Sequence, residues 1–382
     1  LMVATAILDN IFAPRAPETR LDRTLGIYTL GMYGKESSRT GTPGYKFLDR
    51  YMRNLPGAEA TSIFSQFASV SMFVDGRKLD AYIRRTDGEY WRILQFKFLE
   101  GAPFTQADDD AGRMVAVINE TTREKVFGKQ PAVGKMIDVD GQRFRVVGVV
   151  SDVAITRMAA FSEIWVPVRT AKSADYRQQT WGDFGGIVLA KSKDDIPRLK
   201  REFDARISAY VFDDPMFDRI SAGLGTTFES FARTLINGQD SDLVRRGPWI
   251  IRGIMLTVAL LFITLPTMNL VSINLSRIME RSSEIGVRRA FGASSRTLVG
   301  QFVTENVVLT AIGGLIGFVI AMVALYALNT IEFIPYEQFD LNLRIFGYAM
   351  LIALAFGVIS GVYPAWRMAR LDPVNALRGG AV

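Results

Sequence analysis

The 382-residue chain contains no cysteine and no histidine. It can therefore form no disulfide, no cysteine nucleophile, no Ser-His-Asp triad and no structural zinc site of the usual ligand types. The pairs Gly34-Lys35, Gly128-Lys129 and Gly134-Lys135 are not followed by Ser or Thr in a phosphate-binding G-x-x-x-x-G-K-[ST] frame. These absences exclude most familiar classes of enzyme, and they predict that the chain does not bind ATP through such a loop.

Acidic residues are clustered at three places: residues 108–110, 194–195 and 213–214. Metal ligands and acid–base pairs are one interpretation of such clusters, but solvated loops and helix starts explain them more simply. None of the three has the spacing of a calcium-binding loop. We therefore predict no catalytic residue, no metal site and no cofactor within the chain.

Apolar residues, in contrast, make up 49% of the sequence and are concentrated in long runs. Residues 254–273, 307–328 and 345–366 each approach or exceed the roughly 20 residues that a membrane-spanning helix needs. The chain also opens with the apolar run LMVATAIL. We interpret that run as the outer end of a first spanning helix that begins upstream, with a signal-peptide remnant as the alternative.

The distribution of arginine predicts the orientation of these spans. One short loop and the C-terminal tail are rich in arginine, whereas residues 329–344 contain three acids and one arginine. By the positive-inside rule, the arginine-rich loop and the tail are cytoplasmic. The predicted division is residues 1–8 for the end of the first span, 9–248 for an external domain, 249–275 for the second span, 276–300 for a cytoplasmic segment, 301–328 for the third span, 329–344 for an external loop, 345–366 for the fourth span and 367–382 for a cytoplasmic tail.

The external region is predicted to be an α+β domain. Thr42 is predicted to be an N-cap followed by Pro43 at the first helical position, and the amphipathic helix continues over residues 45–55. Asp75-Gly76, between residues 61–74 and 78–84, and Asp140-Gly141, between residues 135–139 and 143–150, indicate β-hairpins. Further expected elements are a strand at 114–118 leading through Asn119 into a helix that ends near Gly128, strands at 163–168 and 186–191, and a helix at 194–210. This order suggests two small units with a boundary near residues 103–112.

Residues 280–294, ERSSEIGVRRAFGAS, lie between the second and third spans and are called the coupling segment below. On a helix, Glu280, Glu284 and Arg288 would share one face and form a row of ion pairs. One interpretation is a short helix that presents charged and apolar groups to a cytoplasmic partner. The other is an ordinary positive-inside loop.

Few polar residues interrupt the spans. Glu305, which follows the coupling segment, is interpreted as an anchor at the membrane interface. Two G-x-x-x-G pairs, Gly313 with Gly317 and Gly357 with Gly361, predict close helix packing. General enrichment of glycine in spanning helices is the alternative.

Three stretches resemble the MacB/FtsX-type permeases of ABC transporters. These are ERSSEIGVRRAFGASSRTLVGQFVTENVVLTAIGGLIGF at 280–318, YPAWRMARLDPVNALRGG at 363–380, and VAVINETTREKVFGKQPAVGKMIDVDGQRFRVVGVV at 115–150, which is similar to the MacB-like periplasmic core. The resemblance implies an α-helical membrane protein with four transmembrane helices and a large external α+β domain. That domain would have a porter-like lobe and an inserted second lobe.

The same resemblance implies partners and a location. It implies a permease homodimer or heterodimer in the bacterial inner membrane, with the large domain in the periplasm, and an ATPase dimer, separate or fused, that holds ATP and Mg. A periplasmic adaptor and an outer-membrane channel would complete the assembly, and no nucleic acid is expected as a partner. In this family the coupling helix docks on the ATPase, and its positions here are Glu280, Arg281, Glu284, Ile285, Gly286, Arg288, Arg289, Phe291 and Gly292.

The sequence departs from the MacB pattern in two ways. It contains no nucleotide-binding domain, and it has Pro266 in the second span where a glycine-rich turn is expected. The expected function is a non-catalytic permease that passes ATP-driven motion to its periplasmic domain, so as to extrude or extract a drug, peptide, lipid or lipoprotein. The alternative is an FtsX-like regulator of a cell-wall hydrolase. A membrane-anchored enzyme is disfavoured because the chain has no catalytic constellation.

Overall fold

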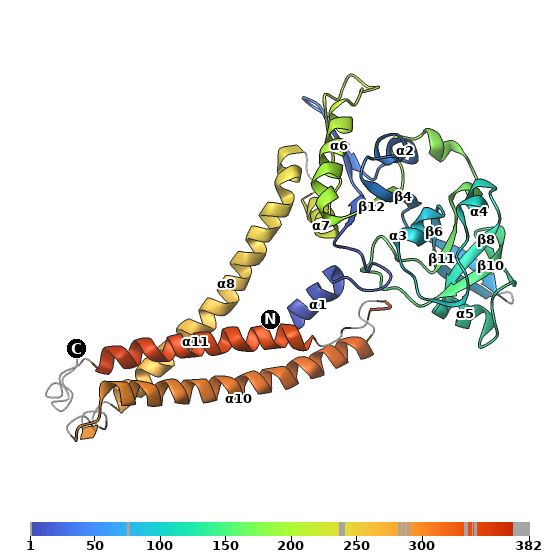
Figure 1. Cartoon of the computed structure of the whole chain (residues 1–382). Coiled ribbons are helices and arrows are strands. Elements are labelled where there is room, and N and C mark those ends of the chain that lie inside the picture. The colour runs from blue at the N-terminus through green and yellow to red at the C-terminus, as the bar shows by residue number, and fades with distance from the viewer. Residues whose placement is uncertain are drawn as a thin grey trace. The chain divides into compact units, whose positions relative to one another are not determined.

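A computed structural model describes residues 2–369 apart from 75–76, 237–240, 282–283, 285–286, 289–290, 332–334, 338 and 340–341. The chain forms two compact units. One is helical and contains Leu1–Asn10, Arg252–Phe333 and Phe339–Val382; the other is an α+β domain formed by Ile11–Ile251 and Ile334–Gln338 (Figure 1). The α+β class expected for the large polar region is therefore confirmed.

The helical unit is built from long apolar helices. The helices that contribute to it are α1 (Met2–Phe12), α8 (Ser241–Glu280), α10 (Ser295–Thr330) and α11 (Leu343–Ala369). Within the described residues, two stretches are long and apolar enough to cross a membrane, Arg246–Arg277 and Val299–Thr330, while the apolar stretch of α11, Phe346–Ile359, is shorter. Helix α8 continues without a break through Pro266.

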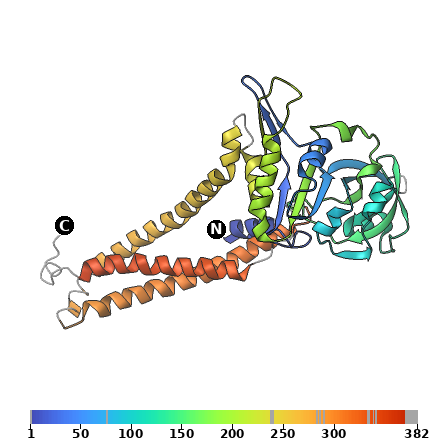
Figure 2. The same ribbon diagram turned by 45° about the horizontal axis from the view of Figure 1, so that its top comes forward.

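Helices α10 and α11 lie side by side (Figures 1 and 2). Glycine allows their close approach, because a Cβ atom added at Gly357 would lie 2.6 Å from the hydroxyl of Thr310. On the other helix, a Cβ atom at Gly314 would collide with the end of Met350. The rings of Phe318 and Phe346 have their centroids 4.4 Å apart across the same pair.

A ten-stranded sheet organises the α+β domain. Its strands are β1 (Thr24–Ile27), β4 (Ala58–Ser65), β5 (Ala68–Val74), β6 (Arg77–Thr86), β7 (Phe98–Gly101), β8 (Val115–Asn119), β9 (Met136–Val139), β10 (Gln142–Val150), β11 (Ile164–Pro167) and β12 (Phe184–Ala190), and their order is β1-β12-β4-β6-β11-β8-β10-β9-β5, with β7 beside β10. A second sheet has the order β13-β2-β3, from Arg219–Ala222, Leu30–Tyr33 and Ser38–Gly41.

Part of the large sheet closes on itself. Strand β5 pairs with β6 and also with β9, so that β6, β11, β8, β10, β9 and β5 form a closed circuit of six strands. Closure removes free strand edges, which otherwise pair with other chains. The inside of this circuit is an apolar core that includes the fully buried Val146, Ile118 and Phe144.

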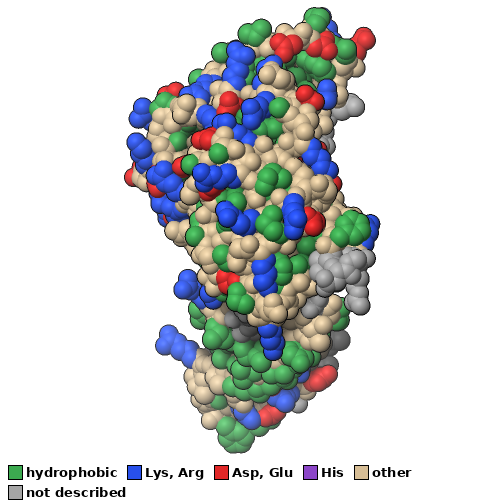
Figure 3. Space-filling view, turned by 90° about the vertical axis from the view of Figure 1, so that its right-hand side faces the viewer, with side chains coloured by type: hydrophobic (Ala, Val, Ile, Leu, Met, Phe, Trp, Pro, Cys, Tyr) green, Lys and Arg blue, Asp and Glu red, His purple; other side chains and the backbone are tan. Residues whose placement is uncertain are grey.

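The other part of the domain packs helices on β12 and β4. Helices α2 (Tyr45–Met52) and α6 (Ile196–Ser208) lie beside these strands in Figure 1. Their apolar faces, with Leu48 on α2 and Leu199 and Phe203 on α6, belong to one core. The remaining helices are α3 (Glu89–Ile93), α4 (Gln106–Asp110), α5 (Glu120–Phe127), α7 (Thr227–Leu235) and the 3₁₀ turns Val168–Thr170, Asp175–Gln178 and Lys193–Asp195. Figure 3 shows Lys and Arg interspersed with Asp and Glu over one face of the domain.

Local sequence signals predicted several elements correctly. Asp140 and Gly141 have φ angles of 52° and 71°, as a type I′ hairpin turn requires, and β9 pairs with β10 around them. The side chain of Asn119 accepts the backbone N–H of Thr122, and α5 ends before Gly128. Strands β5 and β6 pair as expected, although Asp75-Gly76 lies outside the described residues.

Other expectations were wrong. Helix α2 begins after Gly44 and has no side-chain cap, so Thr42 is not its N-cap. The strand expected over residues 61–74 is two strands, because the chain leaves β4 after Ser65 and enters β5 at Ala68. No boundary lies at residues 103–112, since β7 before them and β8 after them both pair with β10. The three aspartates there lie in and around a short capped helix, α4.

Candidate coupling site

The coupling segment connects α8 to α10. Glu280 is the last residue of α8, and Ser294 caps α10 by accepting the backbone N–H of Thr297 at 3.2 Å. The predicted coupling residues Ile285, Gly286 and Arg289 lie outside the described residues.

One ion pair of the expected row is present. Arg288 Nη2 lies 2.6 Å from Glu284 Oε1, which are four positions apart. The same guanidinium donates through Nη1 to Gln301 Oε1 of α10 at 3.1 Å. Arg288 therefore ties the coupling segment to the first turns of the next helix.

A second link lies between Arg281 and Glu305. Arg281 Nη1 is 3.8 Å from Glu305 Oε2 of α10. Around this pair, Asn274 of α8 and Asn306 of α10 are nearly buried, at 6% and 7% exposure. We did not predict this pairing from the sequence; the only signal was Glu305 itself, a carboxylate in an otherwise apolar helix.

The segment also exposes apolar surface. The side chain of Phe291 is 89% exposed and that of Val287 is 46% exposed. Gly292, with φ of +91°, holds a conformation that other residues adopt only with strain, and this turns the chain before α10. Aromatic and arginine side chains on one exposed segment are the composition enriched at protein–protein interfaces.

The four glycines expected to pack helices occupy different surroundings. Gly357 faces Thr310 of α10, as described above. At Gly313 and Gly317, a Cβ atom would meet no described atom within 4 Å. Gly361 lies in α11. Their role as G-x-x-x-G contacts stays a prediction.

Residues 335–337, in the loop between α10 and α11, belong to the α+β domain. The backbone N–H of Ile155 donates to the carbonyl of Pro335 at 3.4 Å, and the hydroxyl of Thr156 donates to a carboxylate oxygen of Glu337. Between them, the hydroxyl of Tyr336 donates to Glu163. Pro335 is only five positions beyond Thr330, the end of α10, so a short stretch of chain connects this part of the domain to that helix.

Glu163 holds the loop from a buried position. It is 5% exposed, and its second oxygen accepts the backbone N–H of Tyr82 at 2.8 Å. The ring of Tyr336 also packs near that of Phe161, with the centroids 6.2 Å apart. Burial, and then the hydrogen bond to Glu163, raise the pKa of Tyr336, which keeps its hydroxyl protonated as a donor.

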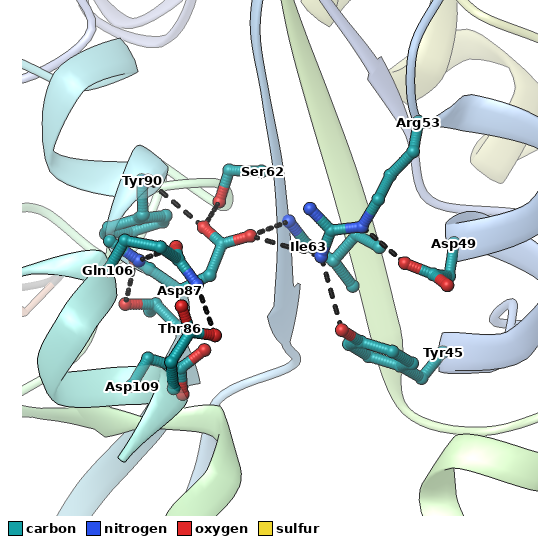
Figure 4. Close-up of polar contacts among 12 residues, drawn as sticks. Tyr45, Asp49, Arg53, Ser62, Ile63, Thr86, Asp87, Tyr90, Gln106 and Asp109 are labelled. Atoms are coloured by element: carbon teal, nitrogen blue, oxygen red, sulfur yellow. Dashed lines mark hydrogen bonds and ion pairs between the residues drawn. The ribbon is translucent and has the colours of Figure 1, made fainter. Parts of the chain in front are cut away.

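A buried carboxylate joins the two parts of the domain (Figure 4). Asp87, which is 2% exposed, follows β6 and accepts hydrogen bonds from the hydroxyl of Ser62 at 2.6 Å and the backbone N–H groups of Ile63 and Tyr90 at 3.1 and 3.2 Å. Arg53, beyond α2, approaches it at 3.6 Å. Burial raises the pKa of Asp87 to about 6, although the hydrogen bonds from Ser62 and Ile63 and the charge of Arg53 oppose the shift.

These features define a class of protein: a membrane-anchored chain whose α+β domain is inserted between apolar helices, with a charged turn joining two of those helices. Comparison with known families agrees. A model of the MacB-like periplasmic core domain matches residues 11–206, and a model of the FtsX-like permease C-terminal region matches residues 256–373. The chain belongs to the MacB/FtsX-type ABC transporter permeases, a family of inner-membrane proteins with periplasmic domains.

The match to curated relatives covers different shares of each relative's length. The chain is 26% identical over 340 residues to the uncharacterized ABC transporter permease YknZ of Bacillus subtilis (strain 168), covering 87% of this chain and 79% of YknZ. It is 25% identical over 363 residues to the macrolide export ATP-binding/permease protein MacB of Escherichia coli O157:H7, covering 93% of this chain and 53% of MacB. The chain thus spans about half the length of that MacB relative.

A solved structure of the extracellular domain of the ABC-type transporter YknZ matches with a TM-score of 0.37 and 20% identity, covering 47% of this chain and 90% of that one.

Proposed function

We propose that this chain is a permease subunit that transmits the motion of a partner ABC ATPase to its periplasmic domain and so extrudes or extracts a substrate. The observation that carries the proposal is the α10–α11 loop, whose residues Pro335, Tyr336 and Glu337 are bound to the α+β domain. A domain held at this loop, in addition to its connections to α1 and α8, follows displacements of α10.

The other half of the route is the coupling segment. Arg281 and Arg288 bind Glu305 and Gln301 of α10, so a displacement of the segment is passed to that helix. The exposed Phe291 offers an apolar contact to an ATPase. ATP and Mg are held by that partner, and this chain supplies no catalytic residue.

The architecture that accompanies this function has four spanning helices and two external lobes. The lobes correspond to the part with α2 and α6 on β12 and β4, and to the inserted six-stranded circuit. A permease dimer with an ATPase dimer is the expected assembly, with an adaptor and an outer-membrane channel as further partners. The candidate substrates are drugs, peptides, lipids and lipoproteins. Drugs are included by analogy with the macrolide export protein MacB.

Affinity purification from native membranes, followed by mass spectrometry and an ATPase assay, tests this function. Copurification of an ATPase with a periplasmic adaptor supports the export role. An ATPase together with a cell-wall hydrolase or its activator transfers the chain to the regulatory role, and the absence of any ATPase contradicts both.

A further inference from the structure

The α+β domain contains an apolar cavity of about 140 Å³ that no step above uses. Its walls come from six parts of the domain. These are the end of α1 at Ile11 and Phe12, residues 18–28, residues 93–94, residues 156–159, Ile187 of β12, and helix α7. An engineered apolar cavity of about 150 Å³ stays dry and binds benzene, so this one can hold a stretch of a single hydrocarbon chain.

Four of the hydroxyl groups in the walls are hydrogen-bonded within the protein. Thr24 donates to the carbonyl of Arg20 at 2.8 Å, Ser230 to that of Gly26 at 3.3 Å, and Thr234 to that of Ser230 at 3.1 Å. Thr156 donates to Glu337 of the α10–α11 loop. A buried water needs two to four polar partners, and these hydroxyls have already used their donors, so the cavity favours an apolar occupant.

The charged groups in the walls are also engaged. Glu18 lies 3.3 Å from Arg157, and both are almost completely buried. Arg20 donates to the backbone carbonyl of Ile93 at 2.9 Å. The Glu18–Arg157 pair is satisfied within the protein, whereas Arg20 Nε is buried and has no hydrogen-bond partner among the described residues.

The mouth of the cavity is apolar as well. Met158, Phe231 and Leu235 line it and are 52%, 37% and 58% exposed. Exposed apolar side chains that continue into an apolar cavity are unfavourable in water and mark a binding surface.

The walls are close in sequence to the membrane helices. Ile11 and Phe12 end α1, and Leu235, which ends α7, precedes the apolar stretch Arg246–Arg277 of α8 by about ten residues. Molecules dissolved in the membrane surface are therefore available to this part of the domain.

The charge around the cavity is positive. Arg20, Arg23 and Arg92 lie close enough to interact, with Glu59 bonded to Arg23 and Glu89 to Arg92. Three arginines against two glutamates leave one positive charge in excess. An amphiphile with an anionic head is favoured over one with a cationic head.

We propose that this cavity binds the hydrocarbon chain of an anionic single-chain amphiphile, of the fatty-acid class. The chain enters past Met158, Phe231 and Leu235, and the carboxylate remains outside near the arginines. Binding at the cavity requires no ATPase, so it succeeds or fails separately from the proposed export function.

Photolabelling of the full chain tests the site. The protein is placed in phosphatidylcholine nanodiscs without ATPase and exposed to a long-chain fatty acid that carries a diazirine near its methyl end, and adducts are mapped by mass spectrometry. Adducts on residues 156–159 and on α7, in addition to those on the apolar helices, are expected. Adducts confined to α8, α10 and α11 would overturn the proposal.

A filling variant and a matched control locate the adducts. Ala159→Leu places three more carbons in the cavity wall and is expected to reduce labelling of α7 about tenfold, which corresponds to about 1.4 kcal/mol. Ala205→Leu makes the same change at an exposed position of α6 and leaves the labelling unchanged. Equal labelling of α7 in the unaltered chain, in Ala159→Leu and in Ala205→Leu would rule out the cavity as the site.

Competition on the unaltered chain gives a second measurement that does not depend on folding of the variant. Unlabelled fatty acid is expected to displace the probe from α7, whereas an alkyltrimethylammonium of the same length is not. A diazirine-bearing diacyl phospholipid is expected to label the apolar helices alone. Displacement by the cation, or labelling of α7 by the phospholipid, contradicts an anionic single-chain ligand.

Discussion

The hydroxyl of Tyr336 donates a hydrogen bond to Glu163, although 173 positions separate them in the chain. Tyr336 lies in the connection between two apolar helices, and Glu163 immediately precedes β11 in the domain. The bond gives the domain a third attachment to the membrane helices, besides its connections to α1 and α8.

Breaking this attachment should separate the motion of the domain from that of the helices. In Tyr336→Phe with Glu337→Ala, we expect hydrogen exchange of residues 280–305 to respond to ATP binding by the partner ATPase as in the unaltered chain. The response of residues 150–165 should be lost, because the bonds to Glu163 and Thr156 are gone.

Tyr348→Phe is the control for this variant, since it removes the same hydroxyl from an exposed position of α11. A normal response of residues 150–165 in the double variant would show that the loop does not carry the motion.

The coupling segment can be tested without changing its net charge. Glu284→Ala with Arg288→Ala removes the ion pair but leaves Arg277, Arg281, Arg289 and Arg296, so the membrane topology set by positive charge is retained. We expect ATP hydrolysis by the partner to continue while substrate movement stops. Arg296→Ala, which removes another positive charge near the segment, should leave coupling intact. Loss of coupling in Arg296→Ala together with normal coupling in the double variant would favour an ordinary positive-inside loop.

Exchanging the charges of Arg281 and Glu305 tests the link between the segment and α10. Arg281→Glu alone places two carboxylates together and should reduce coupling, and Glu305→Arg alone should do the same with two guanidiniums. The double exchange should restore most of the activity, because the pair is re-formed in reverse. If the loss of coupling in the double exchange equals the sum of the losses in the two single variants, Arg281 and Glu305 do not act through each other.

The α+β domain should fold without the membrane helices. A fragment of residues 9–246 contains both sheets and all three apolar clusters, so we expect a soluble protein with a cooperative thermal transition. Circular dichroism and calorimetry measure the transition. A broad, non-cooperative melt would contradict the domain assignment.

Asp87 should make the stability of this fragment depend on pH. Its folded-state pKa of about 6 lies above the ordinary value of 3.8, so the folded state binds the proton more tightly than the unfolded state. Protonation of Asp87 therefore contributes up to about 3 kcal/mol to the free energy of unfolding. This contribution is fully present below about pH 4 and is lost as the pH rises through 6. Relative to Asp87→Asn, the unaltered fragment should therefore lose melting temperature between pH 4 and 7.

The same change at the exposed Asp194, Asp194→Asn, is the control for Asp87. The melting temperatures of Asp194→Asn and of the unaltered fragment should differ by a constant amount between pH 4 and 7. A constant difference for Asp87→Asn as well would show that the buried carboxyl has no raised pKa.

The sequence by itself determined the features that depend only on residues close together in the chain. Length and apolarity define the stretches of α8 and α10 that can cross a membrane, and the positive-φ preference of Asp140-Gly141 sets a hairpin. The spacing of Glu284 and Arg288 produced their ion pair, because residues four apart on a helix are neighbours. Absent cysteine and histidine excluded whole classes of chemistry without any structure.

Only the tertiary structure decided which distant segments meet. Strand β5 closes the circuit by pairing with β9, more than 60 positions away, and alternation of side chains along either strand does not name its partner. The contacts of Arg281 with Glu305, of Tyr336 with Glu163 and of Ser62 with Asp87 join residues whose local patterns are independent. The apolar cavity arises in the same way, since its walls are brought together from six parts of the chain by packing and not by any local motif.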